Sequence, residues 1–217
     1  MQQTTKHIER HLQHLARLIP RRAILAGGAL RAAFDGTTPG DIDFFFRHRW
    51  DYRYACLSFW LLSLFGLYAP LSAPNGTRRF RNKVTGEIIN LVGFVFGTPN
   101  AHMERFDFRC CKMAMTFSRR SGLTFYALPG AINDALNKHL VVVNNNGTRR
   151  TVKRIQRYIR DYGYTLMPAC GLSASEDVEA PPESPEQDAY AADCPAVLAR
   201  WVESRIPCST PRNGYDA

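Results

Sequence analysis

Apolar residues recur along the first part of the chain with two different periods. Between residues 4 and 18 they follow the three- and four-residue spacing of an amphipathic helix, at Ile8, Leu12, Leu15 and Leu18. Pro20 ends that helix. Residues 23–26 and 41–46 are short apolar runs beside turn signals, which predict strands, and residues 29–34 between them predict a short helix. The order expected here is helix, strand, helix, strand.

Residues 54–73 form an uncharged stretch long enough to span a bilayer. Ser58, Ser63, Gly66 and Pro70 interrupt it, and it directly follows a predicted strand. A helix in that position has to pack back onto the sheet. We therefore favour a buried core helix ending near Gly66 over a membrane span.

The pattern then returns to short strands. Residues 78–84 and 87–95 predict a hairpin across a Thr-Gly turn, and residues 106–117 and 123–127 predict two more strands. Residues 129–138 predict a short helix and residues 140–143 a strand. Residues 149–162 predict a basic helix, with Gly163 at the position of a C-cap.

The character of the chain changes after Leu172. Residues 173–194 are acidic and rich in Pro and Ser, which predicts a disordered acidic linker, and within residues 195–217 a short C-terminal helix around Trp201 is expected before the tail. Residues 173–217 hold nine acidic and three basic side chains, net −6, whereas residues 1–172 hold 25 basic and 10 acidic ones, net +15. Such a basic domain typically meets a polyanion such as RNA, although a solvated basic surface has the same composition.

The charge contrast suggests two roles for the acidic tail. It folds over the basic surface and competes with nucleic acid, or it engages a protein partner.

The six cysteines show no zinc spacing and no CxxC pair, and Met1 precedes a polar helix rather than a signal peptide. These features predict reduced thiols, a cytoplasmic location and no membrane partner.

Two carboxylates stand at the start of the second predicted strand. Asp41 and Asp43 are two residues apart, so both project from one face of the strand. Such a pair binds Mg²⁺ or Mn²⁺ and the triphosphate that the metal bridges, although two exposed acids at a strand end look the same in sequence. Gly27 and Gly28, between the first strand and its helix, allow backbone N–H groups to approach a phosphate, and Arg31 lies one turn further on.

The segment ILAGGALRAAFDGTTPGDIDFFF, residues 24–46, resembles the signature of the polymerase-beta-type nucleotidyltransferase superfamily. It is most similar to the head domain of class II tRNA nucleotidyltransferases and bacterial poly(A) polymerases. The resemblance implies an α+β fold with a mixed sheet flanked by helices. It also implies that Gly27, Gly28 and Arg31 serve the nucleotide, and that Asp41 and Asp43 are catalytic and hold the metals. The Asp that follows the family's Arg is Ala32 here.

Residues 105–115 resemble a second family segment, RRDFTINAMAY. By that match Arg105 and Asp107 lie at the ribose, and Asp107 is also a candidate third catalytic carboxylate and metal ligand. Glu87 is the rival for that third place, although its hairpin position favours a surface acid. Arg154 and Arg157 resemble the arginines of a family helix that faces the incoming base. The family's EDxxR motif is missing, and a basic solvated helix is the alternative reading.

The resemblance covers residues 21–166, which we expect to be the nucleotidyltransferase domain behind an N-terminal helix at residues 1–20. It implies transfer of a nucleoside monophosphate from ATP or CTP to a hydroxyl acceptor, for which the basic surface suggests RNA or tRNA. Compact relatives are common among phage genes, which would place the chain in a host cytoplasm. The alternative is a catalytically weak or inactive protein of the same fold that binds nucleic acid or a host factor.

Overall fold

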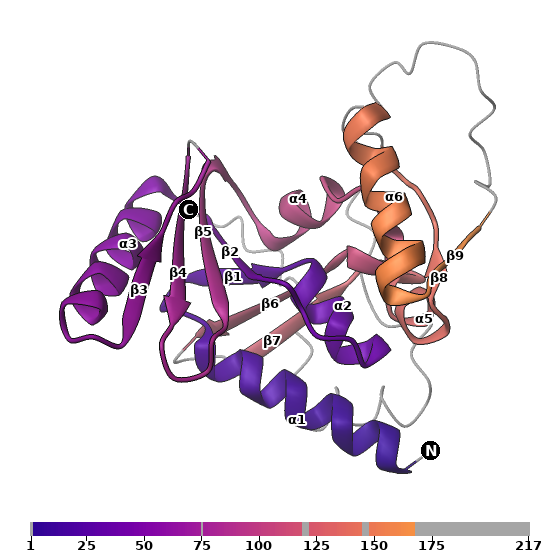
Figure 1. Cartoon of the computed structure of the whole chain (residues 1–217), viewed down its shortest axis with the longest axis horizontal. Helices are drawn as coiled ribbons and strands as arrows, with labels where there is room; N and C mark the ends of the chain where they lie inside the picture. Colours follow the sequence, from indigo (N-terminus) through magenta and orange to yellow (C-terminus); the bar gives the residue numbers. More distant parts are fainter. Residues whose placement is uncertain (1, 75, 119–121, 145–147, 168–217) are drawn as a thin grey trace, which may run out of the picture.

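A computed structural model describes residues 2–74, 76–118, 122–144 and 148–167. Its centre is a seven-stranded mixed sheet with the order β3-β4-β5-β2-β1-β6-β7 (Figure 1). Strand β2 runs parallel to β5, and the other neighbours are antiparallel. The strands are β1 (Ala23–Ala26), β2 (Ile42–Phe46), β3 (Tyr68–Leu71), β4 (Thr77–Asn82), β5 (Ile88–Phe96), β6 (Met113–Ser118) and β7 (Gly122–Ala127). A separate parallel pair joins β8 (His139–Leu140) to β9 (Thr165–Leu166).

Helices cover the two faces of the sheet unequally. The larger core packs the helices α1, α2, α3 and α5 against one face, around Leu25, Phe44 and Phe46. The other face carries a small cluster of Ile24, Ala26, Ala114 and Met103, in which Met103 belongs to α4. The helices are α1 (Gln2–Leu18), α2 (Gly28–Asp35), α3 (Arg49–Leu64), α4 (Pro99–Glu104), α5 (Ala131–Asn137) and α6 (Thr148–Tyr162).

The alternation of β2 explains why one face stays open. Ile42, Phe44 and Phe46 are buried in the larger core, whereas Asp43 and Phe45 point to the other side and are half-buried. On that second side, α4 contacts β1 and β6 and contributes Met103 to the small cluster. Polar side chains on this face of β2 and its neighbours therefore remain accessible to a ligand.

The predicted α+β fold, a mixed sheet flanked by helices, is confirmed. The strand prediction over residues 106–117 is partly wrong, because residues 109–111 form a 3₁₀ turn that buries both Cys110 and Cys111 before β6 begins. The edge strand β3 and the helix α4 were not predicted. Gly163 has a φ of 70° directly after α6, which confirms its C-cap position.

Helix α3 corrects the expectation of a fully buried core helix. Its buried residues are Asp51, Ala55 and Phe59, which recur every four residues and so define one narrow stripe. The sheet covers this stripe alone.

In the described ranges no helix is long and apolar enough to cross a membrane. The linker at 173–194, the C-terminal helix and the cysteines at 170, 194 and 208 lie outside the described residues. Cys56, Cys110 and Cys111 are free cysteines in the structure.

Candidate nucleotide and metal site

Asp41 and Asp43 meet at one point on the open face of the sheet. Asp43 pairs with Asn90 in the parallel register of β2 and β5. The Asn90 amide nitrogen donates to Oδ2 of Asp41 at 2.7 Å and to Oδ1 of Asp43 at 2.9 Å. Arg79 on β4 donates its Nε to Oδ1 of Asn90 at 3.0 Å, and this contact sets which side of the amide faces the carboxylates. Two carboxylate oxygens thus converge on one polar atom.

The environment of Asp43 opposes its ionisation. Burial and the neighbouring Asp41 charge raise the pKa of Asp43 to about 6, against the Asn90 hydrogen bond and the charges of Arg154 and Arg79, which lower it. A cation placed between the two carboxylates would remove this repulsion. The repulsion within the pair therefore favours binding of a cation.

The two glycines of the turn before α2 have different geometries. Gly27 has a φ of 86°, its N–H donates to the Met113 carbonyl at 3.1 Å, and an added Cβ would lie 2.9 Å from the Phe106 ring. Gly28 begins α2, and an added Cβ would meet nothing within 4 Å. The positive φ and the close Phe106 ring therefore require glycine at position 27, whereas the space beside Gly28 is open at the N-terminus of α2.

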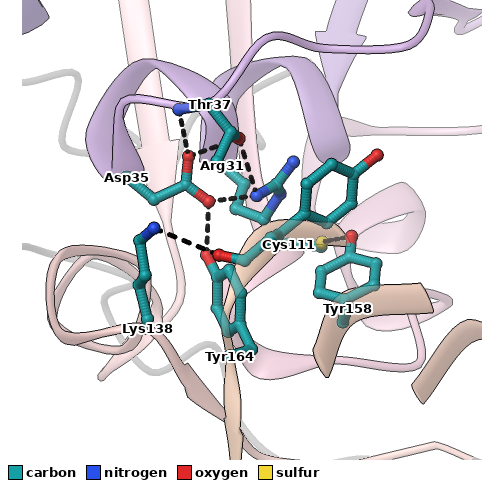
Figure 2. A network of polar contacts seen from close by, with 8 residues as sticks. Arg31, Asp35, Thr37, Cys111, Lys138, Tyr158 and Tyr164 are labelled. Atoms are coloured by element: carbon teal, nitrogen blue, oxygen red, sulfur yellow. Dashed lines mark hydrogen bonds and ion pairs between the residues drawn. The ribbon is translucent and has the colours of Figure 1, made fainter. Parts of the chain in front are cut away.

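Arg31 lies in a closed polar network between α2 and α6 (Figure 2). It is 2% exposed, forms an ion pair with Asp35 and donates to Oγ1 of Thr37 at 3.1 Å. Its guanidinium carbon lies 4.3 Å from the centroid of the Tyr162 ring and 5.1 Å from that of Tyr158. The guanidinium therefore fastens α6 to the helix of the glycine turn, and its predicted contact with the nucleotide stays a prediction.

Further contacts extend this network around Arg31. The Tyr164 hydroxyl donates to Oδ2 of Asp35 at 2.8 Å, and Tyr158 lies 3.0 Å from Sγ of Cys111 (Figure 2). Ala32 stands where the resembling family has an Asp after the arginine, and the carboxylate that Arg31 contacts is that of Asp35, four residues further on. Nothing in the sequence pattern distinguished Asp35 from an ordinary turn residue.

Asp107 holds an arginine of α6. Its side chain is 1% exposed, and its Oδ2 accepts from Nη1 of Arg154 at 2.7 Å. The Arg154 charge also acts on Asp43, so this ion pair lies beside the acid pair. Arg157, three residues further along α6, and Arg105, which follows α4, are exposed. Their nucleotide contacts, and the metal-ligand role of Asp107, stay predictions.

The donor set fits a divalent metal ion. Asp41 and Asp43 offer hard carboxylate oxygens, and rotation of the Asn90 amide away from Arg79 would add its oxygen. In the part of the chain that the structure describes, no three His, Cys, Asp or Glu side chains group as a metal site. Glu87 contacts His14 at 2.5 Å and Thr85 at 2.6 Å instead, as expected of a surface acid. Asn90 was missed because an isolated asparagine in an apolar strand carries no motif.

The sheet order, the glycine turn and the acid pair define a nucleotidyltransferase fold. Solved structures with this fold include CCA-adding enzymes bound to CTP and to ATP, each with a TM-score of 0.54, at 17% and 18% identity. A Thermotoga maritima CCA-adding enzyme complexed with tRNA has a TM-score of 0.53 at 17% identity. These matches cover 76% of this chain and 42% or 43% of theirs, so the chain spans less than half their length.

The family of the chain follows from its sequence. The profile of Gad2, the Gabija anti-defense 2 family, matches residues 1–138, which is more than half of the chain. The chain belongs to this family. No curated protein sequence matches it. The family match includes the glycine turn, the acid pair, Asn90 and Asp107, and it ends before α6.

Proposed function

We propose that the chain is a Mg²⁺- or Mn²⁺-dependent nucleotidyltransferase that transfers a nucleoside monophosphate from ATP or CTP to a hydroxyl acceptor, most simply an RNA or tRNA end. The observation that carries the proposal is the convergence of Asp41 and Asp43 on one atom, next to strand β1, which pairs with β2 and leads into the glycine turn. The CTP, ATP and tRNA complexes of the CCA-adding enzymes support the choice of substrates.

Each part of the site has a role in this reaction. The N-terminus of α2 at Gly28 binds the triphosphate with backbone N–H groups. Asp41 and Asp43 would hold the metal, which would supply positive charge to the phosphates and lower the pKa of the attacking hydroxyl. Arg154, held by Asp107, and Arg157 bind the base or the phosphates from α6. Catalysis then depends on positioning and on electrostatic stabilisation of the transferred group.

The basic rim suits a polyanionic acceptor. Arg79 and Arg81 lie on β4 in register with Asn90 and Ile88, on the face that carries Asp43, and Arg105 lies beyond α4. Of these side chains and those of α6, Arg79 and Arg154 lie near enough for their positive charges to act on Asp43. Phosphates of an RNA end would release counterions on binding there, which predicts an affinity that falls with salt.

The test is transfer of label from each α-labelled NTP to total tRNA, with Mg²⁺ or Mn²⁺. We expect the full chain to label RNA with ATP or CTP, and an Asp41→Asn, Asp43→Asn double variant to label none. Asp161→Asn, which changes an exposed carboxylate on α6, is the matched control and should keep full activity. Failure of the full chain to label any acceptor, although it binds NTP and metal, would contradict the proposal.

A second candidate function is a protein of this fold that acts by binding alone, without turnover. The family name, which refers to countering the Gabija defence, and the loss of the family's Asp at Ala32 favour it. In that case the partner is nucleic acid or a host protein, in the host cytoplasm. The same double variant separates the two functions. If it still counters Gabija in cells as well as the unaltered chain does, binding suffices and transfer is not required.

A further inference from the structure

The outer face of α3 is an unpartnered apolar surface. Opposite its buried stripe, large side chains recur along the helix from Trp50, which is 75% exposed, to Phe65 just after it, which is 80% exposed. The exposed members are Trp50, Tyr54, Leu57, Trp60, Leu61, Leu64 and Phe65, with Leu67 beyond the helix. Isolated apolar residues on a surface are ordinary, but a continuous stripe of this size marks a contact surface.

A group of arginines borders the stripe at its N-terminal end. Arg49, Arg53 and Arg78 line a cavity of about 360 Å³ with Tyr52 and Thr77. The Arg53 guanidinium lies 5.0 Å from the Trp50 ring centroid. Within the described ranges these three arginines form no ion pair with a carboxylate. The surface is therefore complementary to a partner that combines an apolar helical stripe with a neighbouring run of acidic residues.

We propose that this partner is the chain's own C-terminal segment, residues 195–206. Its sequence, PAVLARWVESRI, places Leu198, Trp201, Val202 and Ile206 at helical spacing, which gives one apolar stripe. The preceding residues 173–194 hold seven carboxylates and no Lys or Arg. The apolar stripe complements the outer face of α3, and the carboxylates complement the arginines of the cavity. Both segments lie outside the described residues.

The chain between the two surfaces is long enough. Strand β9 ends at Leu166, so residues 167–194 connect it to the docking segment. A linker of that length extends to about 90 Å at most and has a root-mean-square span of about 30 Å. The seven-stranded sheet, at about 4.8 Å per strand, is about 30 Å wide. Tethering gives the segment an effective concentration of about 1 mM at α3, which favours it over a second copy of the chain.

Tryptophan fluorescence tests the docking in the full chain. The three tryptophans are Trp50 and Trp60 on α3 and Trp201 in the segment, so a Trp201→Phe background reports α3 alone. In this background we expect a Leu198→Asp, Val202→Asp change to raise acrylamide quenching about twofold and to shift emission to the red, because the indoles lose their apolar cover. Thr210→Asp, beyond the segment, is the matched control and should change neither quantity.

A cross-link identifies the occupant. With Leu57→Cys on α3 in a Cys56→Ser background, a short bismaleimide should join residue 57 to Cys194 or Cys208 within one chain, at a yield independent of protein concentration. A cross-link between chains whose yield rises with concentration would instead identify a second copy and overturn the proposal. Unchanged quenching together with no cross-link to either cysteine would also overturn it. Circular dichroism confirms that each variant is folded, and neither readout requires nucleotide transfer.

Discussion

Asn90 faces Asp43 across the parallel strands β2 and β5, and its amide nitrogen lies 2.9 Å from a carboxylate oxygen of Asp43. The same nitrogen lies 2.7 Å from Asp41. The amide therefore satisfies both carboxylates at the point where a metal would bind. It competes with the metal for these oxygens, and because it is neutral it leaves the charge of the pair uncompensated.

Asn90→Asp should lower the stability of the protein without metal and raise its affinity for a metal ion. The change removes the shared donor and adds a third carboxylate, so we expect the free energy of unfolding in EDTA to fall by about 1–3 kcal/mol. Saturating Mn²⁺ should then raise the melting temperature more than it does in the unaltered protein. Denaturation with and without metal measures both effects. Asn133→Asp, at an exposed position of α5, is the control, and equal metal responses in both variants would refute this role of Asn90.

The raised pKa of Asp43 predicts how stability depends on pH. The folded protein holds this proton with a pKa of about 6, against an ordinary value of 3.8, so the folded state binds it more tightly than the unfolded state. The stabilisation is present below pH 4 and is lost as the pH rises through about 6. Asp43→Asn should remove this slope in EDTA and leave the metal-free protein about 1–3 kcal/mol more stable at pH 7.5. Chemical denaturation from pH 4.5 to 7.5 measures it, and an unchanged slope in the variant would contradict the assignment.

The two glycines of the turn provide a matched pair of substitutions. Gly27→Ala places a Cβ 2.9 Å from the Phe106 ring at a φ of 86°, so we expect it to lower stability by about 1–3 kcal/mol. Gly28→Ala meets open space at an ordinary φ, so it should fold normally while nucleotide affinity falls, because the methyl group occupies the approach to the helix N-terminus. Thermal melts and NTP titrations separate these effects. Normal NTP affinity in Gly28→Ala would show that the triphosphate does not approach this turn.

Arg31 should act mainly through stability. Arg31→Leu leaves the buried carboxylate of Asp35 without its cation, which we expect to cost about 3–5 kcal/mol. Arg31→Leu combined with Asp35→Leu should recover part of this loss, since no buried charge remains. Chemical denaturation of the single and double variants measures the coupling. If Arg31→Leu instead retained full stability and lost only NTP affinity, the nucleotide role inferred from the family resemblance would be correct and the structural role wrong.

Local patterns in the sequence predicted the frame of the site well. The glycine turn and the acid pair lie within 17 residues of each other, on elements whose apolar periods are clear, and the structure has β1, α2 and β2 at those positions. The 3₁₀ turn at residues 109–111 was missed because its buried apolar residues have the composition of a strand. Tertiary packing determines that conformation, and the local periodicity of apolar residues does not indicate it.

The partners of the site residues were less predictable. Asn90 is 47 residues from Asp43 in sequence, and Tyr164 is 129 residues from Asp35. Such contacts depend on strand register and on how α6 packs, and neither leaves a sequence motif. The exposure of the outer face of α3 was not predictable either. An uncharged segment predicts a buried helix whether the rest of the molecule covers one side of that helix or both.

Arg154 and Arg157 should separate structural from ligand-binding charge on α6. Arg154 reaches the buried carboxylate of Asp107 at 2.7 Å, whereas Arg157 is exposed. We expect Arg154→Ala to lower the free energy of unfolding by about 1–3 kcal/mol and Arg157→Ala to change it by less than about 0.5 kcal/mol. Both variants should weaken NTP binding, because each removes a positive charge from the rim of the site, and the weakening should diminish in high salt. Urea denaturation and NTP titrations at two ionic strengths measure these quantities. Unaltered NTP affinity in both variants would make α6 a solvated basic helix, which was the alternative interpretation of its sequence.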